Sequence, residues 1–192
     1  MLSIVGFVIL VILASVKGDA LHVASCIVYG LSLVVLYGAS TLYHSTTAPK
    51  HKEIFRILDH SCIYLLIAGS YTPFGMIILN GSLGLNLVII VWTVAGVGIL
   101  LRILLGDRFT ALYVVSYLAM GWIGVFGLKP LLETVGIGAL SLVVAGGAAY
   151  SLGVVFFAWK HFKHHHAIFH IFVLAGSILH YLAVVFYVVP AA

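Results

Sequence analysis

Long apolar runs, separated by short polar breaks, follow one another along the whole chain. The runs are bounded by charged residues, Gly, Pro or Asn, and they cover residues 2–16, 21–44, 57–79, 83–101, 109–128, 135–159 and 167–189. Because a helix of roughly 20 mostly apolar residues crosses a bilayer, the pattern predicts seven transmembrane helices, the first of them shortened. We interpret the first run as a span and not as a signal peptide, since it lacks a basic leading segment and an Ala-x-Ala cleavage site. We therefore expect an all-α polytopic membrane protein with one seven-helix domain over residues 1–192.

Composition agrees with a membrane location and excludes a nucleic-acid-binding role. Of the 192 residues, 64% are hydrophobic and 7% are charged, whereas a soluble domain has about a quarter of charged residues. The net charge of +4 is small, and the basic residues lie in breaks between runs instead of on one face. Cys26 and Cys62 fall inside predicted spans, so we expect buried free thiols and not a disulfide.

The distribution of Lys and Arg predicts which breaks face the cytoplasm. Short loops rich in these residues stay on the cytoplasmic side, and seven basic residues fall on one side of the seven spans against two on the other. The richer side carries Lys50, Lys52, Arg56, Arg102, Arg108, Lys160 and Lys163, and the poorer side carries Lys17 and Lys129. We therefore expect the N-terminus in the cytoplasm and the C-terminus outside.

Two features of the apolar runs concern helix packing. Ala145, Ala149 and Gly153 form a stripe of small residues along the sixth span, which either allows close helix packing or reflects chance in an Ala- and Gly-rich segment. Pro73 lies inside the third span, where it removes a backbone hydrogen bond, so we expect a kink there.

Four polar residues are predicted to meet at the cytoplasmic ends of three spans. His44 closes the second span, Asp59 begins the third, and His166 and His170 lie in the first turns of the seventh. Positions i and i+4 share one face of a helix, so the last two imidazoles can point at one ion. Three neutral imidazoles, an open fourth position and a nearby carboxylate suit a catalytic zinc ion.

The histidines just before the seventh span admit a second interpretation. They could form an interfacial cluster that contacts anionic lipid head groups. We favour this interpretation for His161, His164 and His165, and we favour the metal for His166. His170 lies deeper in the span, where polar groups are costly and usually functional.

Three other polar residues near these ends also have simpler explanations. Asp59 could be a charge favoured by the helix dipole at a helix N-terminus, and Ser40 could hydrogen bond to its own helix backbone. His180 lies about 15 Å further along the seventh span than His170, at the helical rise. That distance is too large for the same ion, so we expect His180 to be a buried packing or hydrogen-bonding residue.

At these residues the chain resembles the hemolysin III family, the bacterial branch of the progestin and adipoQ receptor superfamily. The similar stretches lie in the second, third and seventh spans, in the expected order. They are Ser40-Thr-Leu-Tyr-His44, Leu58-Asp-His-Ser61, Gly69-Ser-Tyr-Thr-Pro73, His166-Ala-Ile-Phe-His170 and Gly176-Ser-Ile-Leu-His180. As an ordered set these motifs are specific, although each alone is modest.

The resemblance implies an adiponectin-receptor-like bundle in a bacterial inner membrane, with zinc near the cytoplasmic side. It assigns His44, His166 and His170 as zinc ligands, Asp59 as the acidic residue that contacts the water on the zinc, and Ser40 as the serine beside the site. Family members usually carry an acidic, Asn- and His-containing segment before the first span, and this sequence begins without one. Either the sequence starts late or that segment is dispensable.

The function that we expect from these residues is zinc-dependent hydrolysis of a membrane lipid, with a ceramide-like amide as the substrate class. The superfamily's resemblance to alkaline ceramidases favours it, as an analogy of fold and site. Two alternatives are a membrane receptor or homeostasis factor with a structural zinc ion, and the cytolytic activity that gives the family its name. A structural zinc ion usually has four protein ligands, and three are identified here.

Other membrane functions fit the sequence less well. A pore should show spans with a sustained polar stripe, and these spans have almost none. A retinal photoreceptor needs a lysine inside a span as its Schiff-base partner, and no predicted span contains one. A bis-histidine haem would need paired histidines across a wide cavity. The expected partner is therefore a membrane lipid, as substrate or ligand, while the oligomeric state is open.

Overall fold

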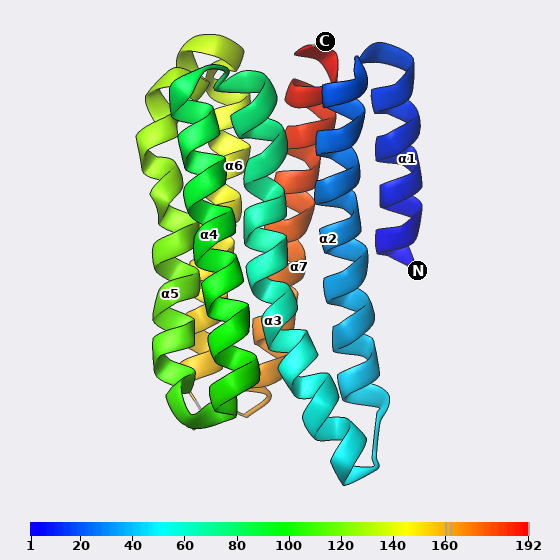
Figure 1. Cartoon of the computed structure of the whole chain (residues 1–192), viewed down its shortest axis with the longest axis vertical. Helices are drawn as coiled ribbons and strands as arrows, with labels where there is room; N and C mark the ends of the chain where they lie inside the picture. The colour runs from blue at the N-terminus through cyan, green and yellow to red at the C-terminus, as the bar shows by residue number, and fades with distance from the viewer. Residues whose placement is uncertain (160, 162, 192) are drawn as a thin grey trace.

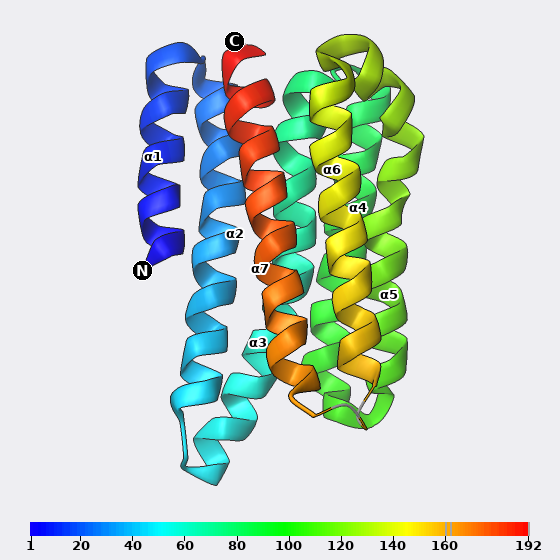
Figure 2. The ribbon, with the colours of Figure 1, turned by 180° about the vertical axis from the view of Figure 1, so that it is seen from behind.

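The chain folds into a bundle of long helices that run side by side (Figures 1 and 2). The computed structural model describes residues 1–159, 161 and 163–191, and in this part it contains seven α-helices and no strand. They are α1 (Leu2–Lys17), α2 (Ala20–Ser45), α3 (Pro49–Pro73), α4 (Ser82–Leu105), α5 (Thr110–Trp122), α6 (Leu128–Ala158) and α7 (His165–Ala183). The all-α prediction is confirmed.

Four helical stretches among the described residues are long and apolar enough to cross a membrane. They are Ala20–Ser45, Pro49–Ile78, Ser82–Ala158 and His165–Ala191. The third stretch contains α4, α5 and α6, which lie next to one another in the bundle (Figure 1). Helix α1 is apolar but shorter, with 16 residues. Seven separate crossings therefore stay a prediction.

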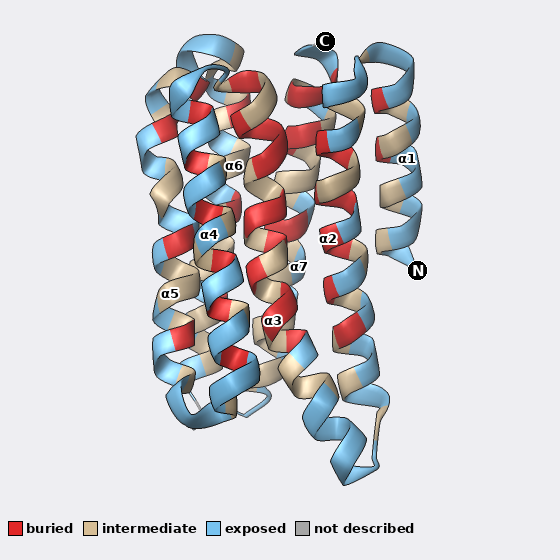
Figure 3. Cartoon of the chain, viewed as in Figure 1, coloured by how far each residue is buried: buried red, intermediate tan, exposed pale blue. Residues whose placement is uncertain are grey.

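Helix α1 lies at the edge of the bundle, and the buried residues concentrate on the inner helices (Figure 3). Leu10 and Ala14 are the buried residues of α1, which packs on α2. On the neighbouring helices, Tyr29 and Val184 belong to the same buried cluster. Cys26 and Cys62 are free and buried, as predicted. Large apolar side chains are exposed along every helix, which suits contact with lipid tails.

Helix α3 begins earlier and ends differently than its apolar run indicates. It starts at Pro49, eight residues before the predicted span, because proline is pre-organised for the first helical position and the polar residues that follow are compatible with a helix outside the bilayer. At its other end, Pro73 is the last α-helical residue, and a π-helical turn over Phe74–Ile78 follows. Proline lacks the backbone N–H that would continue the α-helical pattern.

The connection between α5 and α6 is helical throughout. A 3-10 segment, Ile123–Gly127, follows α5 directly, and α6 then begins at Leu128, seven residues before the predicted sixth span. Gly136 interrupts α6 with φ 83° and ψ −178°, a backbone conformation open to glycine and strained for other residues. Helix α6 therefore consists of a short first segment and a long second one, and the predicted boundary at residue 135 coincides with the interruption.

The close packing of α6 on α7 uses one residue of the predicted stripe, Gly153, together with Gly146, which lies outside it. Ala145 is exposed, whereas Gly146 and Gly153 are buried. A Cβ at Gly146 would lie 2.3 Å from Nδ1 of His180, and a Cβ at Gly153 would lie 3.1 Å from Cβ of Phe172. Small residues of α6 therefore do pack against α7, but Gly146 and Gly153 face that helix and Ala145 does not.

Candidate metal centre

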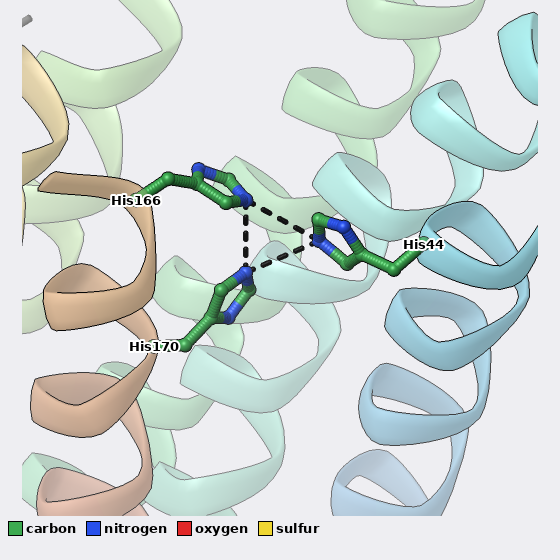
Figure 4. A group of neighbouring side chains, drawn as sticks. All are labelled: His44, His166 and His170. Atoms are coloured by element: carbon green, nitrogen blue, oxygen red, sulfur yellow. Dashed lines mark hydrogen bonds between the residues drawn. The ribbon is translucent and has the colours of Figure 1, made fainter. Parts of the chain in front are cut away.

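Three histidines from two helices converge at one end of the bundle. His44 lies in the last turn of α2, and His166 and His170 lie in the first two turns of α7. The four-residue spacing places both α7 imidazoles on the side that faces α2, and Figure 4 shows all three rings pointing at one another. His44 is exposed, while His166 and His170 are partly buried.

The geometry of the three rings fits a tetrahedral zinc ion. The Nε2 atom of His44 lies 3.3 Å from that of His166 and 3.2 Å from that of His170, and the last two lie 3.0 Å apart. Zinc–nitrogen bonds of 2.0–2.1 Å at tetrahedral angles place ligand nitrogens about 3.3 Å apart. A hydrogen on one of these nitrogens could satisfy only one neighbour, whereas a cation accepts a lone pair from all three, so the donor set favours a metal.

Asp59 and Ser40 lie beside the three histidines. The Asp59 side chain is buried, with 8% of its surface exposed, and it interacts with the Ser40 hydroxyl and electrostatically with His44. Asp59 is outside the group of residues whose ligand atoms converge. Because α3 begins at Pro49, Asp59 lies almost three turns inside the helix, and a dipole effect confined to the first turn does not explain it.

The other histidines of the predicted cluster are not part of the converging group. His161 and His164 are exposed, and His164 precedes α7 with a left-handed backbone at φ 64°. His165 is partly buried and its ligand atoms are not among those that converge. Contact of these three residues with lipid head groups stays a prediction.

A cavity of about 240 Å³ leads from the metal centre into the bundle. Ser40, Asp59, His166 and His170 line its polar end. Its remaining walls are mostly apolar, contributed by every α-helix except α1. A polar end joined to a long apolar chamber suits an amphiphile, whose head group and tail need these two environments.

An ion cluster around a buried arginine, at the same end of the bundle, was missed by the sequence analysis. Arg102 was assigned to a cytoplasmic loop, but it lies in α4 with none of its surface exposed. Its guanidinium contacts the carboxylate of Asp107 and the ring of His60, and Asp107 also contacts Arg56. The signal available in the sequence was Asp107, five residues after Arg102. Without Arg102, the predicted cytoplasmic side still carries more Lys and Arg residues than the opposite side. Lys160, which was also counted, lies outside the described residues.

Loss of Asp107 should destabilise the protein. Asp107→Ala removes the carboxylate that Arg102 and Arg56 share, and it leaves a buried guanidinium without its counter-charge. Removing one partner of a fully buried pair costs about 3–5 kcal/mol, and because the Asp107 side chain is 36% exposed we expect a smaller loss here, roughly 2 kcal/mol. Glu133→Ala is the matched control, because the Glu133–Lys129 pair is exposed at 3.9 Å and contributes about 0–1 kcal/mol. Thermal unfolding in detergent should separate the two variants, and equal midpoints would contradict the structural role of the cluster.

Comparison with known proteins shows similarity over nearly the whole chain. Residues 1–181 match the family described as haemolysin-III related. The chain is 47% identical to Hemolysin-3 of Bacillus cereus over 191 residues, which cover 100% of this chain and 87% of the relative. It is 44% identical to the hemolysin-3 homolog of Bacillus subtilis, with 98% and 89% covered, and 29% identical to the monocyte to macrophage differentiation factor of Homo sapiens, with 82% and 67% covered. No solved structure matches the chain.

Proposed function

The chain is a multi-pass membrane protein that belongs to the haemolysin-III-related family, and we propose that it is a zinc-dependent hydrolase of a membrane lipid. The proposed substrate class is a ceramide-like lipid amide. The observation that carries the proposal is the junction of three converging imidazoles, a buried carboxylate and an apolar cavity.

His44, His166 and His170 would hold the zinc ion through their Nε2 atoms. Catalytic zinc sites keep three protein ligands and one open position, and this centre provides three. When bound, zinc would lower the pKa of a water molecule toward about 7 and polarise a carbonyl group. A structural zinc ion, as in the receptor alternative, usually has a fourth protein ligand.

Asp59 and Ser40 would supply the proton chemistry. The Asp59 carboxylate lines the cavity beside the histidines, where it can accept a proton from the attacking water as a general base. The Ser40 hydroxyl faces this carboxylate and would hold its orientation. The apolar part of the cavity would hold the acyl chain of a lipid and exclude bulk water from the reacting amide.

We also propose that the chain crosses a bacterial inner membrane seven times, with the N-terminus inside. The basic residues in the first turns of α3 and in the connections between helices favour the side that holds the metal centre as the cytoplasmic side. A reporter fused after Ala192 should then be active only on the outer face. Activity of that reporter in the cytoplasm would mean that one span is miscounted, and the short α1 is the first to re-examine.

Cytolysis is the second candidate function, favoured by the names of the two Bacillus relatives. The cavity argues for a bound lipid more than for a conducting pore, because its walls are mostly apolar. The test is fatty-acid release from lipid amides by zinc-loaded wild-type protein and by His170→Ala, run beside dye leakage from the same vesicles. Zinc-dependent release without leakage supports the hydrolase, and leakage without release supports cytolysis.

A further inference from the structure

His180 carries a polar atom inside the bundle that the metal centre does not use. It lies in α7, ten residues beyond His170, which places it about 15 Å further along the helix. Its side chain lines the same cavity as His170. Polar groups at such a depth in a membrane protein are costly and usually functional.

The hydrogen bonding of His180 fixes which of its nitrogens is free. Nδ1 lies 2.9 Å from the carbonyl oxygen of Gly176, and a carbonyl oxygen can only accept, so Nδ1 carries the hydrogen. In a neutral imidazole Nε2 is then an acceptor with a free lone pair. Among the described residues, Nε2 has no hydrogen-bond partner.

The neighbours of His180 hold its ring in place. The ring stacks on Tyr150, with centroids 5.5 Å apart and planes at 29°, and its Nδ1 edge faces Gly146. The Tyr150 hydroxyl lies 2.9 Å from Oγ of Ser177, and Tyr37 donates to the same oxygen at 2.9 Å. These contacts join α2, α6 and α7 and orient the imidazole, but none of them uses Nε2.

We propose that Nε2 of His180 is a specificity-determining acceptor for a hydroxyl group carried on the tail of the bound amphiphile. This inference rests on one part of the proposed function, namely that the head group of the lipid lies at the metal centre. The hydroxyl then lies about 15 Å from the head, and the ligand atom must be a donor, because Nε2 can only accept. The surrounding cavity wall is mostly apolar, so a tail without a donor leaves the imidazole unpaired.

The test is a binding comparison that needs no turnover. The probes are two octadecanoic acids, one hydroxylated and one with an oxo group, each substituted about 15 Å from its carboxylate. The two tails have similar size, but the oxo group cannot donate and remains an unpaired acceptor. The purified full chain should bind the hydroxy acid at least fivefold more tightly than the oxo acid, by displacement of a fluorescent fatty acid.

Three variants assign the preference to Nε2. His180→Phe retains a ring for stacking but has no acceptor, so the preference should disappear, whereas His180→Gln retains an acceptor oxygen and should keep part of it. His161→Phe is the matched control, because it makes the same chemical change at an exposed histidine outside the cavity and should keep the full preference. A preference that survives in His180→Phe, equal binding of both acids to wild type, or binding of neither acid would overturn the proposal.

The same preparations distinguish this inference from the proposed hydrolysis. Zinc-dependent amide cleavage with equal binding of the two acids would overturn the role of His180 and leave the hydrolase standing. A preference for the hydroxy acid in a protein that cleaves no lipid amide would support the acceptor role of His180 and contradict the proposed hydrolase activity.

Discussion

Asp59→Asn is expected to keep zinc bound while lipid amide hydrolysis falls by about 10²–10⁴, the usual range for a removed general base. The substitution preserves the size of the side chain but replaces the proton acceptor with an amide. The three imidazoles are unchanged, and loss of a supporting partner costs about 10–100-fold in metal affinity or activity, not the whole site. Metal content and initial rates, measured on the same zinc-loaded sample, check both parts.

Glu53→Gln is the matched control for this experiment. Glu53 also lies on α3 and undergoes the same chemical change, but it is exposed and outside the cavity. Its variant should retain both zinc and rate. Complete loss of zinc from Asp59→Asn would make Asp59 a direct ligand and the site structural. Retained zinc with no turnover in wild type, across a broad panel of lipid amides, would favour the receptor function.

Metal removal is expected to lower the thermal stability of the wild type. A ligand at 100 times its dissociation constant stabilises the folded state by about 2.7 kcal/mol, which corresponds to roughly 5–10 °C in a chain of this length. A chelator should therefore lower the unfolding midpoint of the wild type, and zinc should restore it. His44→Ala should show neither effect, because two ligands do not hold zinc tightly.

His161→Ala is the control for the thermal experiment. His161 is exposed and does not belong to the converging group, so its variant should respond to chelator and zinc as the wild type does. An identical zinc response in His44→Ala and wild type would exclude His44 from the metal centre.

The convergence of the histidines could be predicted because it depends on two strong signals. Long apolar runs place helix ends at a membrane face, and the four-residue spacing places His166 and His170 on one helix face. The structure brings both near His44 at the end of α2. The sequence motifs that contain these histidines also indicated the hemolysin III family, and the match of residues 1–181 to the haemolysin-III-related family confirms it.

Other features could not be predicted because hydropathy does not record three-dimensional neighbours. Arg102 looked like a loop residue since it follows an apolar run, but Asp107 and His60 allow it to be buried at the end of α4. The polar first turns of α3 carry no membrane signal, so the start at Pro49 was missed. For the same reason the stripe considered for packing on α6 included the exposed Ala145 and left out the buried Gly146.

The cavity is also invisible to a sequence pattern. Its walls come from residues that look like ordinary span residues, such as Val143 and Phe157, and only the packing of six helices leaves space between them. His180 was expected to be a packing or hydrogen-bonding residue, and its bond to Gly176 agrees with that expectation. That the free nitrogen belongs to a cavity-lining side chain became visible only in the structure.

Elemental analysis of purified protein tests the metal centre most directly. Wild type and His170→Ala are purified in parallel, loaded with zinc and dialysed against metal-free buffer, with His165→Ala as the control. Geometry at the three Nε2 atoms predicts about one zinc per chain in wild type and His165→Ala, and a small fraction of that in His170→Ala. A wild type without zinc, or equal zinc in wild type and His170→Ala, would contradict the central claim.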